Sequence, residues 1–173
     1  MNLLISRLYK KIIETPLGAM VAVADEDALY MLYFQDGKNC MSKMQKLENI
    51  FGSAIISGST KIHAFLEEEL KKYFSGSLKE FSTPIKWIGT AFQINVWSQV
   101  QKIPAGATGS YLQLAQTIGN QKSVRAVANA QAKNHILLLI PCHRIIKSNG
   151  DICGYNGGVT RKKWLLEHEK LRL

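Results

Sequence analysis

Short apolar runs separated by turn signals dominate the beginning of the chain. Between Tyr9 and Phe34 these runs are interrupted at residues 15–18 (Thr-Pro-Leu-Gly) and at residues 25–27 (Asp-Glu-Asp). Proline, glycine and clustered aspartates favour turns between extended segments. The pattern therefore predicts two or three antiparallel strands.

The next segments change to the spacing of helices. Residues from Lys43 to Phe51 and from Thr60 to Phe74 carry apolar side chains three and four positions apart, which predicts two helices that cover the sheet. Residues 75–77 (Ser-Gly-Ser) end the second helix. We expect a domain boundary between residues 80 and 90, and we divide the chain into residues 1–86 and 87–173.

The second half has a mostly helical pattern. A helix is predicted from Phe92 to Val100, and Ser110 is a suitable N-cap for another helix through Ile118. After the Gly-Asn pair at 119–120, a further helix is expected from about Gln121 to Lys133. Two helices across such a turn form a helix-turn-helix pattern, although any compact helical domain contains similar pairs.

Two features of the last of these helices favour contact with a duplex. It carries the basic side chains of Lys122 and Arg125, and its small residues would allow close approach to nucleic acid. These small residues are Ala126, Ala128 and Ala130.

A continuous apolar run, Ile136 to Ile140, leads into Pro141-Cys142-His143-Arg144. Five apolar residues before a proline predict a fully buried segment that brings the following residues to a fixed place. A glycine-rich loop follows, and Thr160 to Leu171 is predicted to form the closing helix.

The charge is distributed unevenly between the halves. Residues 1–89 contain 11 Lys and Arg against 10 Asp and Glu, whereas residues 90–173 contain 11 against 3. An excess of +8 in one half favours a polyanionic partner, first nucleic acid and second an anionic membrane surface, with a merely solubilising surface as the alternative.

Length and composition narrow the class of protein. A chain of 173 residues with 46% hydrophobic content can form a core without disulfides or metals. Because no signal sequence and no run of eighteen apolar residues is present, we expect a soluble, cytoplasmic protein without a membrane partner. Three cysteines with no zinc-like spacing argue against a disulfide framework and against a metal site.

Cys142 is the cysteine whose surroundings suggest chemistry. Cys40 and Cys153 are interpreted as small buried apolar residues, the commonest role of a lone cysteine. Cys142 lies between a proline and a histidine, with an arginine next. A free thiol with an ordinary pKa is mostly protonated at neutral pH, so a nucleophilic cysteine needs a base or a positive neighbour.

His143 is the candidate base. Neighbouring residues of an extended segment point to opposite sides, so contact with Cys142 can be direct or through a water molecule. A histidine base also needs an acceptor that fixes its tautomer, and Glu167 and Glu169 are the only glutamates in the basic half.

These residues together resemble a known family. The run from Ile140 to Ile146, Gly154-Tyr155, Gly157-Gly158 and residues 164–169 (Trp-Leu-Leu-Glu-His-Glu) are similar to the O6-alkylguanine-DNA alkyltransferases, also called methylated-DNA–protein-cysteine methyltransferases. The similarity continues back through residues 89–93, 103–104, 110–111, 114–115 and 124–127, in the same order. It covers the second half, while the first half is similar mainly in its strand-rich pattern and residues 15–18.

The resemblance implies a fold and an activity. The fold would be α/β, with an N-terminal ribonuclease H-like α/β domain and a C-terminal, mostly helical, winged helix-turn-helix domain. The activity would be direct-reversal repair: the alkyl group of O6-alkylguanine, and of O4-alkylthymine, moves irreversibly from double-stranded DNA to the protein after base flipping. Such a protein would act once, without a cofactor, and as a monomer.

The resemblance also assigns roles to single residues. Cys142 would accept the alkyl group, His143 would lower its pKa through a bound water, Glu169 would orient His143, and Tyr111 would donate a proton to the departing base. Arg125 would enter the duplex, with Lys122, Ala126 and Ala128 beside it on the DNA-binding helix. Asn134 would be a hinge, and Tyr155 and Asn156 would line the base pocket.

Three positions depart from the family pattern. Asn156 stands where serine is common, Leu112 where glutamine is frequent, and His135 where proline is usual. These changes leave the reaction itself untouched but affect the expected pocket size, inhibitor sensitivity and preference for larger alkyl groups. The zinc-binding cysteines of some members have no counterpart, so no metal is expected.

Two other classes of protein compete with this interpretation. A non-catalytic helix-turn-helix protein, either a regulator or a damage sensor, would show the same basic half, but non-repairing members of the family lack the cysteine. A cysteine hydrolase would need an oxyanion hole, and no residues are identified for one.

Overall fold

The computed structural model of the chain describes residues 7–152 and 154–173. In chain order its strands are β1 (Tyr9–Ile13), β2 (Met20–Ala24), β3 (Leu29–Phe34), β4 (Ile56–Ser57), β5 (Gly109–Ser110) and β6 (Ile145–Ile146). Its α-helices are α1 (Cys40–Phe51), α2 (Lys61–Ser75), α3 (Ala91–Gln101), α4 (Tyr111–Thr117), α5 (Val124–Lys133) and α6 (Val159–Arg172). Two 3-10 turns are η1 (Gln121–Ser123) and η2 (Cys142–Arg144).

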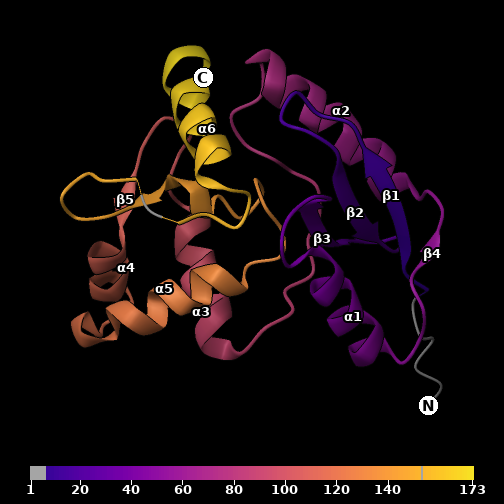
Figure 1. Cartoon of the computed structure of the whole chain (residues 1–173), viewed down its shortest axis with the longest axis horizontal. Helices are drawn as coiled ribbons and strands as arrows, with labels where there is room; N and C mark the ends of the chain where they lie inside the picture. The colour runs from indigo at the N-terminus through magenta and orange to yellow at the C-terminus, as the bar shows by residue number, and fades with distance from the viewer. Residues whose placement is uncertain (1–6, 153) are drawn as a thin grey trace.

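The first half is a four-stranded sheet with helices packed against it. The strand order is β3-β2-β1-β4, in which β1, β2 and β3 are antiparallel and β4 runs parallel to β1. Figure 1 shows α2 lying along the sheet and α1 at the end near β3. The three antiparallel strands and both helices confirm the sequence prediction, whereas the two-residue β4 was not predicted.

Every residue of β2 and β3 is buried. These strands therefore lack the alternation of apolar and polar residues that a sheet with one solvated face would show. They form the centre of the molecule, and the apolar residues of both halves pack around them in one continuous core.

The second half is mostly helical, as predicted. Thr90 and Ser110 cap α3 and α4 through reciprocal hydrogen bonds with Gln93 and Gln113, three residues further along. Gly119 follows α4 with a φ of +78°, a left-handed conformation that favours glycine. The predicted helix from about Gln121 is present, but its first turn is the 3-10 turn η1 and α5 begins at Val124.

Backbone hydrogen bonds join the two halves at the outer edge of β3. Leu32 donates to the His135 carbonyl over 2.9 Å, and Leu137 donates to the Leu32 carbonyl over 2.8 Å. At the same edge, Leu29 pairs with the segment at Ile85, the end of the first half. The sheet of the first half therefore fixes the segment that leads into Cys142.

The run from Ile136 to Ile140 is fully buried, as predicted, but it is compact and not extended. Leu139 donates to the Leu137 carbonyl, Ile140 donates to the Ile136 carbonyl, and Leu138 has a φ of +70°. A left-handed leucine is strained and must be held by its surroundings, here a tightly packed core. The turn shortens the path from β3 to Cys142.

No helix in the described part of the chain is long and apolar enough to cross a membrane.

Candidate active site and nucleic-acid interface

Cys142 begins the 3-10 turn η2, directly after the buried run. Its side chain is buried, and its Sγ accepts a hydrogen bond from Asn134 Nδ2 over 3.2 Å. The same amide group donates to the Ile140 carbonyl over 2.9 Å, while Asn134 Oδ1 accepts from the Ile136 amide. Asn134 thus connects the end of α5 to both ends of the buried run and to the sulfur.

Burial raises the pKa of the Cys142 thiol, because a thiolate is poorly solvated inside the protein. The Asn134 hydrogen bond and the positive charges of Lys162 and Lys43 act in the opposite direction. In the free protein the balance favours the protonated thiol. A reaction at the sulfur therefore needs a base that removes this proton.

His143 is completely buried behind Cys142. Its Nε2 lies 2.7 Å from Glu169 Oε1, and its Nδ1 has no hydrogen-bond partner among the described residues. Burial lowers the pKa of His143, and Glu169 only partly opposes this effect, so the ring is neutral at physiological pH. A neutral ring that donates from Nε2 has a free acceptor at Nδ1.

The prediction of an extended backbone at Cys142 and His143 is wrong. Cys142 and His143 lie in a 3-10 turn and not in an extended segment. No direct hydrogen bond between their side chains occurs among the described contacts. Contact between sulfur and imidazole must be indirect or follow a small movement.

Glu169 in α6 is the carboxylate that holds His143. It also accepts from Arg144 Nε over 2.9 Å, from Arg144 Nη2 over 3.0 Å, from the Tyr73 hydroxyl over 2.7 Å and from the Gly106 amide over 3.3 Å. Burial alone would raise the pKa of Glu169, but His143 and Arg144 outweigh it and hold the pKa well below its ordinary value. Glu169 is therefore ionised.

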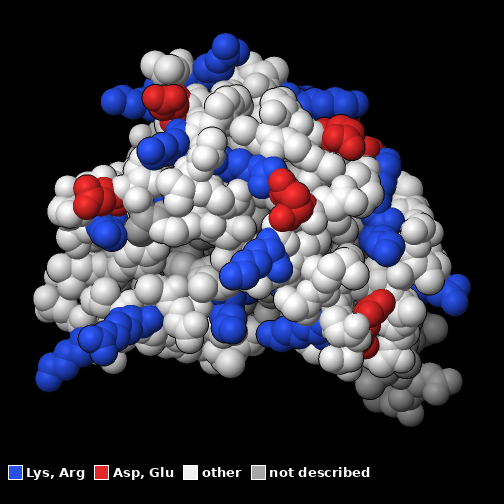
Figure 2. Space-filling model, viewed as in Figure 1, with Lys and Arg blue, Asp and Glu red and all other residues white. Residues whose placement is uncertain are grey.

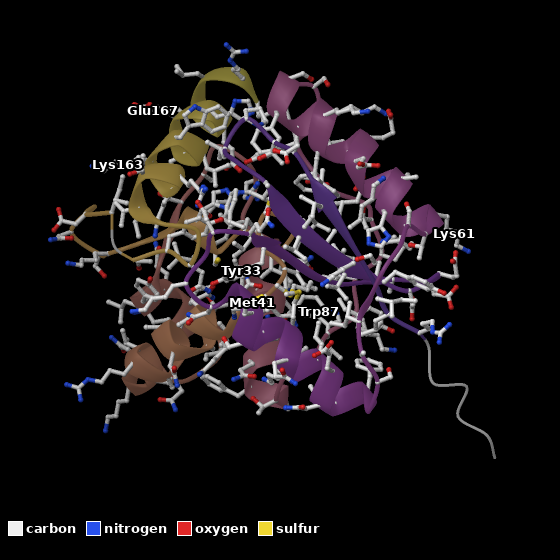
Figure 3. The ribbon with its side chains drawn as sticks, turned by 45° about the vertical axis from the view of Figure 1, so that its right-hand side comes forward. Tyr33, Met41, Lys61, Trp87, Lys163 and Glu167 are labelled. Atoms are coloured by element: carbon white, nitrogen blue, oxygen red, sulfur yellow. The ribbon has the colours of Figure 1, made fainter. Side chains whose placement is uncertain are left out.

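The alternative carboxylate, Glu167, lies on the outer face of α6. Its side chain is exposed, and Figure 3 shows it beside Lys163 on the surface. The structure therefore selects Glu169 from the two glutamates that the sequence left open.

A cavity of about 320 Å³ opens beside Cys142. It brings together five of the residues predicted for the site and three further ones. Its walls are formed by Tyr111, Ala128, Gln131, Ala132, Cys142, Gly154, Tyr155 and Asn156. Sequence reasoning missed the buried Gln131 and the exposed Ala132, because their position at the cavity is set by the packing of α5.

The pocket loop is attached to the end of α5 through Asn156. Asn156 Nδ2 donates to the Ala132 carbonyl over 3.1 Å and to the Asn134 carbonyl over 3.3 Å. The neighbouring Tyr155 ring meets the His143 ring edge-on at 6.1 Å between centroids. These hydrogen bonds of Asn156 therefore hold the loop side of the cavity against the end of α5.

The exposed face of α5 and η1 carries the residues predicted to meet DNA. Lys122, Arg125 and Ala126 are exposed and Ala128 is half-buried, but Ala130 is buried and its carbonyl accepts from Trp97 Nε1 over 2.9 Å. The prediction was therefore wrong for Ala130, which packs against α3. Figure 2 shows Lys and Arg side chains at the lower left, in the region of α4 and α5.

The other two cysteines and the possible metal ligands complete the description of the site residues. Cys40 is buried and free, as predicted, and Cys153 lies outside the described part of the chain. The described residues contain no cluster of three His, Cys, Asp or Glu side chains that could hold a metal ion.

Comparison with known proteins assigns the chain to a family. Residues 91–171 match the DNA-binding domain of 6-O-methylguanine DNA methyltransferase, and residues 8–87 match its ribonuclease-like domain. A methylated-DNA–protein-cysteine methyltransferase of Methanosarcina acetivorans is 35% identical over 94% of this chain and 98% of its own length. The corresponding protein of Shigella flexneri is 38% identical over 94% of this chain and 96% of its own.

The chain belongs to the 6-O-methylguanine DNA methyltransferase family.

Solved structures of this family have the same fold. The O6-methylguanine methyltransferase of Mycobacterium tuberculosis is 31% identical, covers 96% of this chain and 94% of its own, and superposes with a TM-score of 0.82. A structure of the M. tuberculosis OGT in complex with DNA gives the same identity and TM-score. The fold class expected from the sequence, with an N-terminal ribonuclease-like part and a C-terminal DNA-binding part, is confirmed.

Proposed function

We propose that this member of the methyltransferase family repairs O6-alkylguanine in DNA by direct reversal, with Cys142 as the acceptor of the alkyl group. The arrangement that carries the proposal is a buried cysteine in the wall of a base-sized cavity, in front of a histidine held by an ionised glutamate. The exposed, basic start of α5, the helix whose later residues line the cavity, supplies a surface for DNA.

The proton of the thiol goes to His143. Its Nδ1 is an unpaired acceptor among the described residues, and Glu169 stabilises the imidazolium that forms. A water molecule between Sγ and Nδ1 is the proposed path for this proton. The sulfur is protonated at rest and becomes nucleophilic when this transfer occurs.

The sulfur then attacks the carbon that is bonded to O6 of the guanine. A carbon–sulfur bond forms, the carbon–oxygen bond breaks, and its electron pair remains on the base. We assign Tyr111, which lines the cavity, as the donor that protonates the departing guanine. The product is a thioether, which water does not hydrolyse, so each chain reacts once and needs no cofactor.

The base must leave the double helix to reach Cys142. We propose that Arg125 enters the duplex from the first turn of α5, with Lys122, Ala126 and Ala128 beside it, and fills the space left by the flipped nucleotide. The cavity behind α5 would receive the base, with Tyr155 and Asn156 on its far side. O4-alkylthymine is a second substrate under the same mechanism.

Transfer of a labelled methyl group tests the proposal. Duplex DNA with radiolabelled O6-methylguanine should leave one label per chain on Cys142, and Cys142→Ser should bind the DNA but take up no label. Binding without label in the intact chain would favour the alternative, a non-catalytic damage sensor. Release of product beyond one equivalent would contradict single turnover.

We further propose that the protein acts as a cytoplasmic monomer on double-stranded DNA that contains alkylated guanine. Light scattering of the protein with and without DNA would detect a dimer.

A further inference from the structure

The side chain of Lys43, in the first half of the chain, contacts the end of α5. Lys43 of α1 donates from Nζ to the Asn134 carbonyl over 2.9 Å and to the Lys133 carbonyl over 3.3 Å. These carbonyls belong to the end of α5, where helical carbonyls lack partners within the helix and the helix dipole is negative. Lys43 therefore caps α5 from outside the helix.

The lysine is held in place on its other side. Its Nζ lies 5.1 Å from the centre of the Tyr33 ring in β3, and Figure 3 shows Tyr33 near α1. Burial lowers the pKa of Lys43 to about 8, and Lys46 and Lys133 add to this effect. The two carbonyls and the Tyr33 ring partly replace the solvation that the ammonium group loses on burial.

Asn134 connects this lysine to the sulfur. Its carbonyl accepts from Lys43, while its side-chain amide donates to Cys142 Sγ. The positive charge of Lys43 also favours the thiolate of Cys142 directly. The other charged or titratable groups that face this cluster include Tyr33, Lys46, Lys133 and His135 around Lys43, and Lys162 and Tyr155 around Cys142.

We propose that Lys43 is a positioning residue of the alkyl-transfer reaction: it fixes Asn134 and supplies a charge that stabilises the Cys142 thiolate. This inference rests on the proposed function, and it gives the first half of the chain a part in the chemistry. Lys43 is not among the residues that line the cavity, and it contacts the end of α5 opposite Arg125, so its effect should fall on the reaction step and not on DNA binding.

Three variants separate this role from a general effect of charge. Lys43→Met keeps the apolar stem but removes the charge and the donors, and Lys43→Arg restores both. Lys46→Met removes the same charge from the same helix at an exposed position, with no bond to Asn134 among the described contacts. Thermal unfolding of each variant first establishes that it is folded.

Two measurements are made on each folded variant. The pH dependence of Cys142 alkylation by iodoacetamide, followed by mass spectrometry of the Cys142 peptide, gives the thiol pKa without DNA. Single-turnover methyl transfer at saturating DNA gives the rate of the reaction step, and titration with unmodified duplex gives the dissociation constant.

We expect Lys43→Met to raise the thiol pKa by about one pH unit and to slow transfer about tenfold, since one unit corresponds to a tenfold change in thiolate. Lys43→Arg should recover most of both, and Lys46→Met should leave both unchanged. The dissociation constant of Lys43→Met should stay within about twofold of that of Lys46→Met, because each loses one charge.

An unchanged thiol pKa in Lys43→Met, an equal loss in Lys46→Met, or no recovery in Lys43→Arg would overturn the proposal. If Lys43→Met does not fold, Lys43→Gln replaces it with the same expected direction. If the unaltered chain transfers no methyl group, the proposed function fails, while the iodoacetamide measurement still decides whether Lys43 controls the thiol.

Discussion

Glu169 takes part both in the proposed proton path and in the packing of the two halves. It receives hydrogen bonds from His143 and Arg144 next to Cys142, and from Tyr73 of α2 in the first half. A buried carboxylate with this many donors is stable only while all of them remain in place. Its charge therefore contributes to stability as well as to the reaction.

Glu169→Gln should destabilise the protein by about 3 kcal/mol at pH 7, because Arg144 then stays buried without a counter-ion. The pKa of Glu169 is lower in the folded chain than its ordinary value of 4.5. Its stabilisation is thus fully present above that value and is lost as the pH falls through the folded pKa. Urea unfolding at pH 7 and pH 4 measures the free energy of unfolding of Glu169→Gln and of the unaltered chain. The difference between these two free energies should be smaller at pH 4 than at pH 7.

Transfer by Glu169→Gln should also be slower at saturating DNA, since the imidazolium of His143 loses its partner. Glu167→Gln, an exposed change on the same helix, is the control and should leave stability and rate unaltered. A stability difference that grew toward acidic pH would contradict an ionised Glu169.

Different parts of α5 carry the residues proposed for DNA binding and those that surround Cys142. Its exposed start carries Arg125, while its buried side and C-terminal end hold the cavity wall and Asn134. Changes at the start should therefore affect the delivery of the base, and changes at the end should affect the chemistry of the sulfur.

Arg125→Ala should slow methyl transfer from duplex DNA by about tenfold or more, because the extruded base loses the side chain that replaces it in the stack. Transfer from a free alkylguanine should not change, since no stack must be opened. Single-turnover rates with both substrates measure the two effects.

Lys122→Ala is the matched control for charge at the same face. It should weaken DNA binding uniformly and reduce the salt dependence by about one unit of the logarithmic slope. If Arg125→Ala slowed transfer from the free alkylguanine as much as transfer from duplex DNA, Arg125 would support the fold and not base flipping.

The helices were predictable because their spacing and caps are local signals. Ser110 and the Gly119 turn define α4 in the sequence as in the structure. The two-residue β4 has too few residues for a pattern, and the turn at Leu138 depends on β3 and the surrounding core. Cys142 and His143 were singled out from their sequence context and Glu169 from the family resemblance. Lys43 and Tyr73 were not, because only the folded chain brings them close to these residues.

In the whole molecule, residues of the first half hold the segment around Cys142, which belongs to the second half. β3 pairs with the segment after Asn134, Tyr73 reaches Glu169, and Lys43 reaches the end of α5. In addition, Arg161 of α6 in the second half donates two hydrogen bonds, of 2.9 and 2.8 Å, to the carboxylate of Asp36 in the first half. The division after residue 86 stays a prediction, and these contacts imply that its two parts do not unfold independently.

A fragment of residues 87–173 should therefore lose the structure around Cys142, although it contains the proposed cysteine, base and DNA-binding helix. Without β3, the backbone groups of His135 and Leu137 lose their partners at Leu32, and the apolar run beside them faces water. Thermal unfolding is measured by circular dichroism and by Trp fluorescence. We expect the intact chain to unfold in one transition and the fragment to show no cooperative transition. Mixing it with residues 1–86 tests whether the missing contacts suffice to restore methyl transfer. A fragment that unfolds cooperatively and transfers at the rate of the intact chain would mean that the first half has no part in holding the site.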